Sequence, residues 1–256
     1  WKRTDRRDVR VRQLLDHSSG LPAHDRVWID GVAGRAAIDA RIAALPLAYP
    51  TGSRSVYSDV GFIALGFVLE TIAGCALARQ FAAFAEPWSA SLGYRPSAAE
   101  RVRIAPTEVD PWRGRLLVGE VHDENAAQLD GVAAHAGLFG SVEDVAAFAR
   151  LVLETFDSRT RLGDADLMRR FATRTGVPGS SRALGWDTMR PTSSCGTRLS
   201  VSAIGHTGFT GTSLWIDWAR DLYVVLLTNR VHPTRTRDAF VALRPAIHDA
   251  IVAALD

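Results

Sequence analysis

The chain has 256 residues, of which 47% are hydrophobic and 23% are charged, and its formal net charge is +2 at pH 7. This composition is typical of a folded globular domain and excludes a disordered chain, and the small net charge excludes the large basic surface that binds nucleic acid. The longest apolar run, residues 60–69, is far shorter than the roughly 20 residues that cross a bilayer, so we predict no transmembrane segment.

Helices are predicted in the first part of the chain. Residues 9–16 have the apolar spacing of a short helix, and the glycine and proline of the following "GLP" would end it. Residues 33–45 are rich in alanine and carry apolar residues at helical spacing, which predicts a second helix. Proline, glycine and serine are frequent in residues 47–56, so we expect a loop there.

The next predicted helix is buried. Residues 60–69 are apolar on nearly every side, a pattern typical of a helix that other parts of the protein surround. Ser58 or Asp59 is expected to cap its N-terminus. Because Tyr57 precedes the cap, we expect three polar side chains at the fixed end of a buried helix.

Residues 93–140 are rich in loop-forming residues, and a helix is predicted after them. Ser141 and Asp144 have the spacing of a capping box. The helix that they begin is expected to reach about residue 155.

Strands are predicted after about residue 180. Residues 198–206 alternate between apolar and polar, and residues 212–218 and 221–229 are rich in β-forming residues on either side of a tight turn. This pattern indicates a strand followed by a hairpin. Residues 234–255 return to helical spacing.

The order of these elements predicts an α/β chain of the α+β type, with an antiparallel sheet flanked by helices. We expect a single domain over residues 1–256. Within it, about residues 26–175 would be mainly helices and loops, and about residues 180–256 would supply antiparallel strands and a C-terminal helix.

The basic residues restrict the possible catalytic groups. Lys2 is the only lysine among the 30 basic residues, and all the others are arginines. Arginine keeps its proton even when buried, whereas a buried lysine can be tuned to act as a base. A catalytic lysine is therefore excluded from the rest of the chain.

Three short motifs carry a resemblance to a known family. They are "HSSGLP" at residues 17–22, Tyr57-Ser58-Asp59, and His206-Thr207-Gly208, and the longer segments 121–149 and 205–233 extend them. Together they resemble the serine β-lactamase and penicillin-binding protein superfamily, in particular its class C-like, esterase-like branch. The resemblance covers essentially the whole chain and implies a β-lactamase/transpeptidase-like fold.

The resemblance also implies a site. Members use a Ser-x-x-Lys nucleophile, a Tyr-x-Asn or Ser-Asp-Asn element and a Lys-Thr-Gly strand. Carried onto this sequence, it implies Tyr57 and Asp59 as catalytic residues. The residues that it implies for substrate binding lie at the buried helix and on the strand: Ser58, His206, Thr207, Gly208 and Phe209.

Physical chemistry agrees with these roles. Tyrosine is a poor base at its free pKa of about 10 and becomes useful only where cations favour the phenolate or where it relays a proton. A glycine on the strand lets substrate lie close to the backbone, where the N–H of Phe209 could donate to an oxyanion. The hydroxyl of Thr207 could bind a substrate carboxylate or carbonyl.

The sequence departs from the family pattern in three places. No serine stands three residues before a lysine, so the nucleophile element is absent. His206 replaces the usual lysine, and a partly neutral imidazole grips a carboxylate less firmly, which favours esters or amides without an obligatory carboxylate. Asp59 replaces asparagine and, when ionised, only accepts hydrogen bonds.

The missing nucleophile leaves two interpretations open. We expect an N-terminally truncated chain that lacks the first strands and the nucleophile helix, because Trp1 is not a natural start. The complete enzyme would then hydrolyse a β-lactam, a D-Ala-D-Ala-type peptide or a small ester through an acyl-enzyme. The alternative is a catalytically inactive module that binds peptidoglycan-like ligands.

Neither a metal nor a cofactor is expected. The spacings of His17, His24, His122 and His135 match no metal motif, so we predict hydrogen-bonded or exposed histidines. Similarity to relatives suggests that residues 122–125, "HDEN", form a wall of the substrate cleft. The resemblance also favours a periplasmic, secreted or cell-envelope location.

Overall fold

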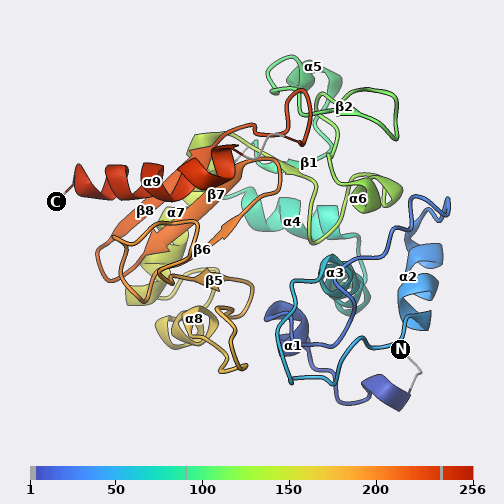
Figure 1. Ribbon diagram of the computed structural model, residues 1–256, viewed down its shortest axis with the longest axis horizontal. Coiled ribbons are helices and arrows are strands. Elements are labelled where there is room, and N and C mark those ends of the chain that lie inside the picture. The colour runs from blue at the N-terminus through green and yellow to red at the C-terminus, as the bar shows by residue number, and fades with distance from the viewer. Residues whose placement is uncertain (1–3, 90, 237–238, 256) are drawn as a thin grey trace. The chain divides into compact units, whose positions relative to one another are not determined.

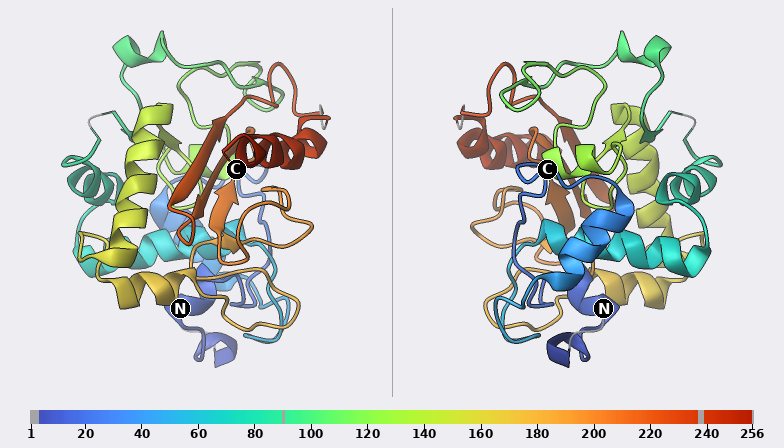
Figure 2. Two further views of the ribbon diagram at one scale, coloured as in Figure 1. Left: turned by 90° about the vertical axis from the view of Figure 1, so that its left-hand side faces the viewer. Right: turned by 90° about the vertical axis from the view of Figure 1, so that its right-hand side faces the viewer.

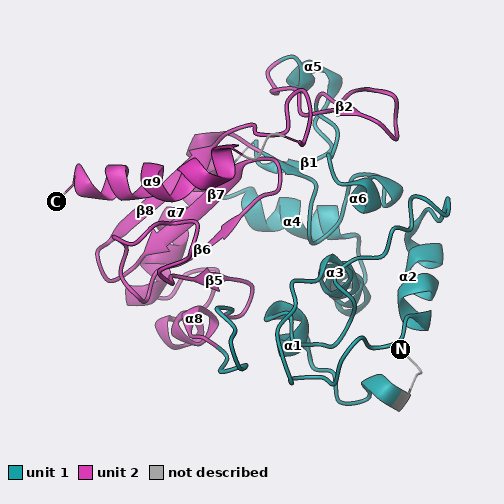
Figure 3. Cartoon of the chain, viewed as in Figure 1, with its two compact units in different colours: residues 1–102, 119–139, 175–182 teal, residues 103–118, 140–174, 183–256 magenta. Residues whose placement is uncertain are grey.

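The computed structural model describes residues 4–89, 91–236 and 239–255 and divides the chain into two units (Figure 1, Figure 3). Unit 1 contains residues 1–102, 119–139 and 175–182, and unit 2 contains residues 103–118, 140–174 and 183–256. Unit 1 is mainly helical, and unit 2 holds the larger sheet.

The elements of unit 1 are short except for its central helices. In chain order they are η1 (Thr4–Arg6), α1 (Val11–Leu15), α2 (Arg35–Ala44), α3 (Asp59–Ala73), α4 (Leu77–Ala85), β1 (Gly93–Tyr94), α5 (Ala98–Arg101), α6 (Glu124–Gln128) and β4 (Leu138–Phe139). Strands β1 and β4 pair antiparallel. The core forms where buried residues of α3, including Ile63, pack against Leu14 of α1 and Ile38 of α2.

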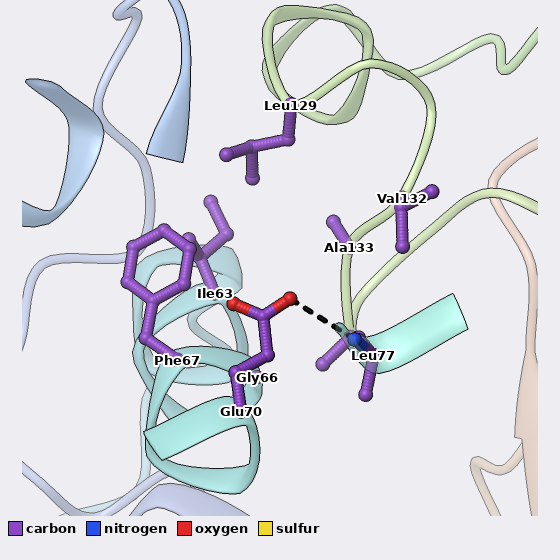
Figure 4. A pocket seen from close by; sticks show the side chains of 9 residues that line it. Ile63, Gly66, Phe67, Glu70, Leu77, Leu129, Val132 and Ala133 are labelled. Carbon is purple, nitrogen blue, oxygen red and sulfur yellow. Dashed lines mark hydrogen bonds between the residues drawn. The ribbon is translucent and has the colours of Figure 1, made fainter. Parts of the chain in front are cut away.

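Helix α3 ends at a sharp bend. Gly74 adopts the left-handed conformation, with φ of 64°, and donates its N–H to the carbonyl of Glu70. The Glu70 carboxylate also accepts the N–H of Leu77 at 3.0 Å, so one residue joins the end of α3 to the start of α4 beside a small, mainly apolar pocket (Figure 4). No single helix in the described part of the chain is long and apolar enough to cross a membrane. Helices α3 and α4 pass that test only as a pair, and they are bent by 79°.

Unit 2 is built on a four-stranded antiparallel sheet. Its elements are β2 (Val109–Asp110), β3 (Arg115–Leu116), α7 (Val142–Asp157), α8 (Ala165–Ala172), β5 (Asp187–Thr188), β6 (Ile204–Thr207), β7 (Thr212–Asp217), β8 (Leu222–Leu227) and α9 (Ala239–Ala253). Strands β5, β6, β7 and β8 are hydrogen-bonded in that order, and β2 pairs with β3 apart from them.

Helices cover both faces of this sheet. Ile204 and Ile216 pack with residues of α7 and α8, such as Ala149. On the other face Trp215 packs with Val252 of α9. Figure 2 shows the strands lying between α7 and α9. Unit 2 therefore has three layers, and the strand that carries the His-Thr-Gly motif belongs to the middle one.

Most predicted elements are present. The helices expected at residues 9–16, 33–45 and 60–69 correspond to α1, α2 and α3, and the predicted hairpin is β7 and β8, joined by a turn at residues 218–221. Ser141 and Asp144 form the predicted capping box of α7. The sequence did not predict helices η1, α4, α5, α6 and α8 or the short strands β1 to β5. Residues 237–238 of the last predicted helix lie outside the described residues.

One local prediction was wrong. The strand expected from residue 198 begins only at Ile204, because residues 198–202 form bends and a turn, and Asp217 accepts the N–H of Ser200 there at 2.7 Å. Cys75 is half-buried at the bend between α3 and α4. Cys195 is buried, and both cysteines are free thiols.

Candidate active site

Ser58 holds the start of α3. Its side-chain oxygen accepts the N–H of Gly61 at 2.9 Å and donates to the carbonyl of Pro22 at 2.7 Å. Its own N–H donates to Nδ1 of His17 at 3.0 Å, so the proton of that neutral imidazole is on Nε2. Ser58 is 1% exposed. The hydroxyl is thus engaged within the chain, and its contact with substrate stays a prediction.

Tyr57 lies at the surface beside this cap. Its ring is 4.6 Å from that of His17, and the guanidinium carbon of Arg182 is 5.4 Å from its centroid. Partial burial raises the pKa of Tyr57 to about 12, the negative charge of Asp59 adds to the rise, and Arg182 opposes it. Tyr57 is therefore a neutral phenol at pH 7 in this chain, able to donate a proton.

Asp59 is the first residue of α3, where the helix dipole favours a negative charge. Its Oδ2 lies 2.7 Å from Nδ1 of His24, and its N–H donates to the carbonyl of Ala23 at 2.9 Å. The Asp59 side chain is 16% exposed. Its charge acts on the hydroxyl of Tyr57, so the structure brings these two predicted catalytic residues together.

A second carboxylate acts on the same hydroxyl. Asp123, in the "HDEN" stretch, is the N-cap of α6 and lies 2.9 Å from Nε2 of the buried His135. The negative charge of Asp123 contributes to the raised pKa of Tyr57. Three of the four histidines considered as metal ligands thus have hydrogen-bond partners: His17, His24 and His135.

The other predicted residues lie in unit 2, around the end of β6. His206 and Thr207 pair with Leu214 and Ser213 of β7, and Nδ1 of His206 lies 2.9 Å from the carbonyl of Thr207. Gly208 donates its N–H to Thr212 at 2.8 Å, and a Cβ on Gly208 would lie 2.2 Å from the Thr212 hydroxyl. A glycine is therefore required to close this turn unless Thr212 rotates.

Phe209 is 57% exposed at this turn. Two arginines, Arg230 and Arg235, lie beside its ring. The guanidinium carbon of Arg230 lies 4.3 Å from its ring centroid, and Nε of the same arginine donates to the Phe209 carbonyl at 2.6 Å. Arg235 lies 5.8 Å from the ring and is held by Glu108 at 2.7 Å. The motif that carries histidine in place of lysine is thus flanked by fixed positive charges.

No cluster of three or more histidine, cysteine, aspartate or glutamate residues in the described part of the chain has a metal-binding arrangement. The polar groups described above are instead engaged with one another or with the backbone.

Comparison with known proteins identifies the family. A family model described as Beta-lactamase matches residues 1–246. The chain belongs to the β-lactamase family. This confirms the resemblance found in the sequence and makes the chain part of a family of serine hydrolases.

Curated relatives of this β-lactamase-family chain include two named enzymes. An N-acetylmuramyl-L-alanine amidase of Bacillus subtilis (strain 168) is 33% identical over 259 residues, which covers 88% of this chain and 56% of the relative. A putative D-alanyl-D-alanine carboxypeptidase of Escherichia coli (strain K12) is 31% identical over 257 residues, 88% of this chain and 57% of the relative. The chain thus spans less than two thirds of the length of these relatives.

Solved structures confirm the β-lactamase/transpeptidase-like fold. A β-lactamase/D-alanine carboxypeptidase from Yersinia pestis, complexed with citrate, is similar with a TM-score of 0.71 and 16% identity, over 97% of this chain and 70% of that chain. A penicillin-binding protein homologue from Caulobacter crescentus is similar with a TM-score of 0.67 and 18% identity, over 94% and 71% of the two chains.

Sequence reasoning missed several residues of this β-lactamase-family site. Arg182 lies against the Tyr57 ring from a distant part of the chain, and no motif marks it. His17 begins the "HSSGLP" motif, but the sequence did not predict that its ring contacts that of Tyr57. The pairing of Asp123 with His135 was also missed, although similarity to relatives had suggested the "HDEN" stretch as a cleft wall. Only the three-dimensional contacts reveal the arginines around Phe209.

Proposed function

We propose that the complete protein, meaning this chain together with any sequence before residue 1, hydrolyses an acyl bond of a peptidoglycan-like peptide through a serine acyl-enzyme. The family match and the names of the relatives, an amidase and a putative D-alanyl-D-alanine carboxypeptidase, support this proposal. Tyr57 is the proposed acid–base group of this reaction.

The nucleophile is proposed to lie outside these 256 residues. No serine stands three residues before a lysine in the chain, and the chain spans only 56–57% of the length of its relatives. A Ser-x-x-Lys element in the remaining length would supply both the attacking hydroxyl and a positive charge. In this proposal the 256 residues by themselves bind substrate but do not turn it over.

The proposed reaction proceeds in two steps. The serine hydroxyl attacks the acyl carbon and transfers its proton to the lysine amine, while Tyr57 donates its proton to the leaving nitrogen as the acyl–nitrogen bond breaks. Water then attacks the acyl-serine, one water proton returns to the serine oxygen, and the carboxylic acid leaves with the other. The lysine ammonium returns its proton to the Tyr57 phenolate, which restores both groups. The N–H of Phe209 and the hydroxyl of Thr207 are proposed to bind the substrate carbonyl and carboxylate.

The observation that carries this proposal is the fixed, neutral Tyr57 at the cap of a buried helix. A phenol with a pKa of about 12 keeps its proton at pH 7 and can donate it to a leaving group. Ser58 and His17 fix the backbone directly after it, and its ring packs 4.6 Å from that of His17.

The test is Tyr57→Phe in the complete protein. We expect kcat/KM for a D-Ala-D-Ala-type peptide to fall by about 10²–10⁴-fold, the usual contribution of a general acid or base. Tyr223→Phe is the control, because the Tyr223 hydroxyl contacts only the surface residue Arg150 at 3.0 Å among the hydrogen bonds described. Unchanged turnover by Tyr57→Phe would refute the proposed role. Ligand binding without turnover by the complete wild-type protein would favour an inactive binding module.

A further inference from the structure

Both hydrogen bonds that hold Asp123 end on the same carboxylate oxygen. Oδ1 accepts the N–H of Ala126 at 2.7 Å and lies 2.9 Å from Nε2 of His135. Oδ2 forms no hydrogen bond with the residues that the structure describes, and 30% of the side chain is exposed. Asp123 is therefore a fixed carboxylate with one oxygen open to a ligand.

His135 orients Asp123 from the interior. The His135 side chain is 3% exposed, so it does not reach the surface itself. Its Nδ1 is buried and has no hydrogen-bond partner in the described part of the chain. Nε2 therefore carries the proton that is shared with Asp123, and His135 is placed to fix the direction of the carboxylate.

Asp123 remains ionised in this setting. Burial alone would raise the pKa of its carboxyl group, but the hydrogen bonds with His135 and Ala126, together with the electrostatic effects of His135 and His122, hold the pKa below its ordinary value. An ionised carboxylate has no proton to donate, so its open oxygen can only accept a hydrogen bond.

The Asp123 carboxylate lies within electrostatic range of Tyr57. The charge of Asp123 acts on the Tyr57 hydroxyl, as does that of Asp59, while Arg182 lies against the ring. A second acceptor without a donor is present on the first turn of α6. Asn125 is 8% exposed, its Nδ2 donates to the backbone, and its buried Oδ1 has no partner among the described residues. Asn125 Oδ1 is enclosed, so of these two acceptors the partly exposed Asp123 carboxylate is the one that a donating ligand can meet.

We infer that Asp123 is a specificity-determining residue that accepts a hydrogen bond from an N–H group on the acyl side of the substrate, with His135 as its positioning residue. The inference rests on the proposed function and deepens it, because it selects among acyl substrates. Peptide-like acyl groups carry such an N–H, whereas simple esters do not. A substrate without the N–H leaves the open oxygen of Asp123 without a donor.

The test uses the complete protein and two substrates that differ in one group. These are a thioester of N-acetylglycine and the thioester of 4-oxopentanoic acid with the same thiol, in which CH₂ replaces the N–H. We expect kcat/KM to be about tenfold or more higher for the N-acetylglycine thioester, since a hydrogen bond to a charged group has this effect. Thiol release measures both reactions.

Asp123→Asn is the decisive variant. The amide oxygen keeps the place of Oδ1, where Ala126 and His135 donate, so the amide nitrogen replaces Oδ2 and meets the substrate N–H with hydrogens of its own. We expect the ratio of the two kcat/KM values to fall to about one, because kcat/KM falls for the N-acetylglycine thioester and stays unchanged for the other. Asp130→Asn is the matched control, because the side chain of Asp130 is 84% exposed and the same charge is removed.

Variants at His135 show whether this residue acts by orienting the Asp123 carboxylate or only by filling space in the interior. In His135→Gln the side-chain amide can still donate to Asp123, and we expect the preference to be retained. In His135→Leu no donor remains, and we expect the preference to fall by several-fold. The melting temperature of each variant shows whether the fold is kept.

The outcomes distinguish the inference from the function on which it rests. If Asp123→Asn lowers kcat/KM equally for both thioesters, or leaves the preference intact, the inference is wrong and the proposed function stands. If the wild-type protein cleaves neither thioester and no D-Ala-D-Ala-type peptide, the proposed function is wrong, and the inference falls with it.

Discussion

Tyr57 is surrounded by charges of both signs. Asp59 and Asp123 disfavour the phenolate, Arg182 favours it, and burial outweighs each of them, so the pKa rises to about 12. A base at this position would need further positive charge. The lysine of a Ser-x-x-Lys element would supply that charge, and arginine, the cation that this chain offers, cannot exchange protons near neutral pH.

Titration of Tyr57 tests this charge balance. The ultraviolet absorbance of phenolate, taken as the difference between the 256-residue chain and its Tyr57→Phe variant, is expected to appear with a midpoint near pH 12. Arg182→Gln removes the opposing cation and is expected to move the midpoint upward. In the complete protein the added lysine is expected to move it downward. A midpoint at or below pH 10 in the 256-residue chain would contradict the described environment.

At the scale of elements, α9 and the sheet share a buried polar contact. Nε2 of His248 lies 3.1 Å from the hydroxyl of Ser213 on β7, and His248 is fully buried. Ser213 pairs with Thr207, so this contact supports the strand that carries the His-Thr-Gly motif. Burial lowers the pKa of His248 to about 4, the charge of Arg244 lowers it further, and Asp249 opposes them.

The stability of this contact depends on pH. A histidine with a lowered folded-state pKa stabilises the fold above its unfolded pKa of about 6.5, and that stability is lost as the pH falls toward 4. We expect the free energy of unfolding to drop by at most about 3 kcal/mol between pH 6.5 and 4 from this group alone. Urea unfolding of the wild type and of His248→Gln measures it. The variant should show a smaller drop, and an equal drop in both proteins would exclude His248 as the source.

Gly205 allows β6 and β7 to approach each other. A Cβ on Gly205 would lie 2.3 Å from Cδ2 of Trp215 and 2.5 Å from the carbonyl oxygen of Leu214, so the strands would have to separate. We expect Gly205→Ala to lower the free energy of unfolding by about 1–3 kcal/mol, as overpacked core positions do. Gly93→Ala is the control, since no atom lies within 4 Å of its added Cβ. Equal stability of the two variants would contradict the described packing.

The sequence predicted elements where the signal is local. The cap at Ser58 and the capping box at Ser141 depend on residues three apart, and both are present. Turn formation overrode apolar alternation at residues 198–202, because Asp217, distant in sequence, accepts a backbone N–H there. A period of two in a short segment is therefore weaker evidence for a strand than a capping motif is for a helix.

In the candidate site, too, the sequence predicted what is local and missed what depends on tertiary contacts. Tyr57, Ser58 and Asp59 are adjacent in sequence, so a motif could identify them. The environment of Tyr57 comes from tertiary contacts, such as the hydrogen bond from Ser58 to His17, which spans 41 residues. No spacing rule predicts such a contact, and the same holds for the pairing of Asp123 with His135.

At the scale of the whole molecule, the family assignment and the fold are established, and the catalytic activity is a proposal. Strand β8 is an edge of the four-stranded sheet and has no second strand partner in the described part of the chain. Its residues, Leu222–Leu227, are β-forming, and such an edge readily pairs with another strand. We propose that sequence before residue 1 supplies a strand here as well as the nucleophile.

The most direct test is covalent labelling of the complete protein by a fluorescent penicillin, followed by mass spectrometry of the labelled peptide. Our account predicts one labelled serine, followed three residues later by a lysine and located before residue 1 of this chain, with no labelling of the 256 residues alone. A label on a serine within these 256 residues, or a complete protein that no acylating ligand labels, would contradict it.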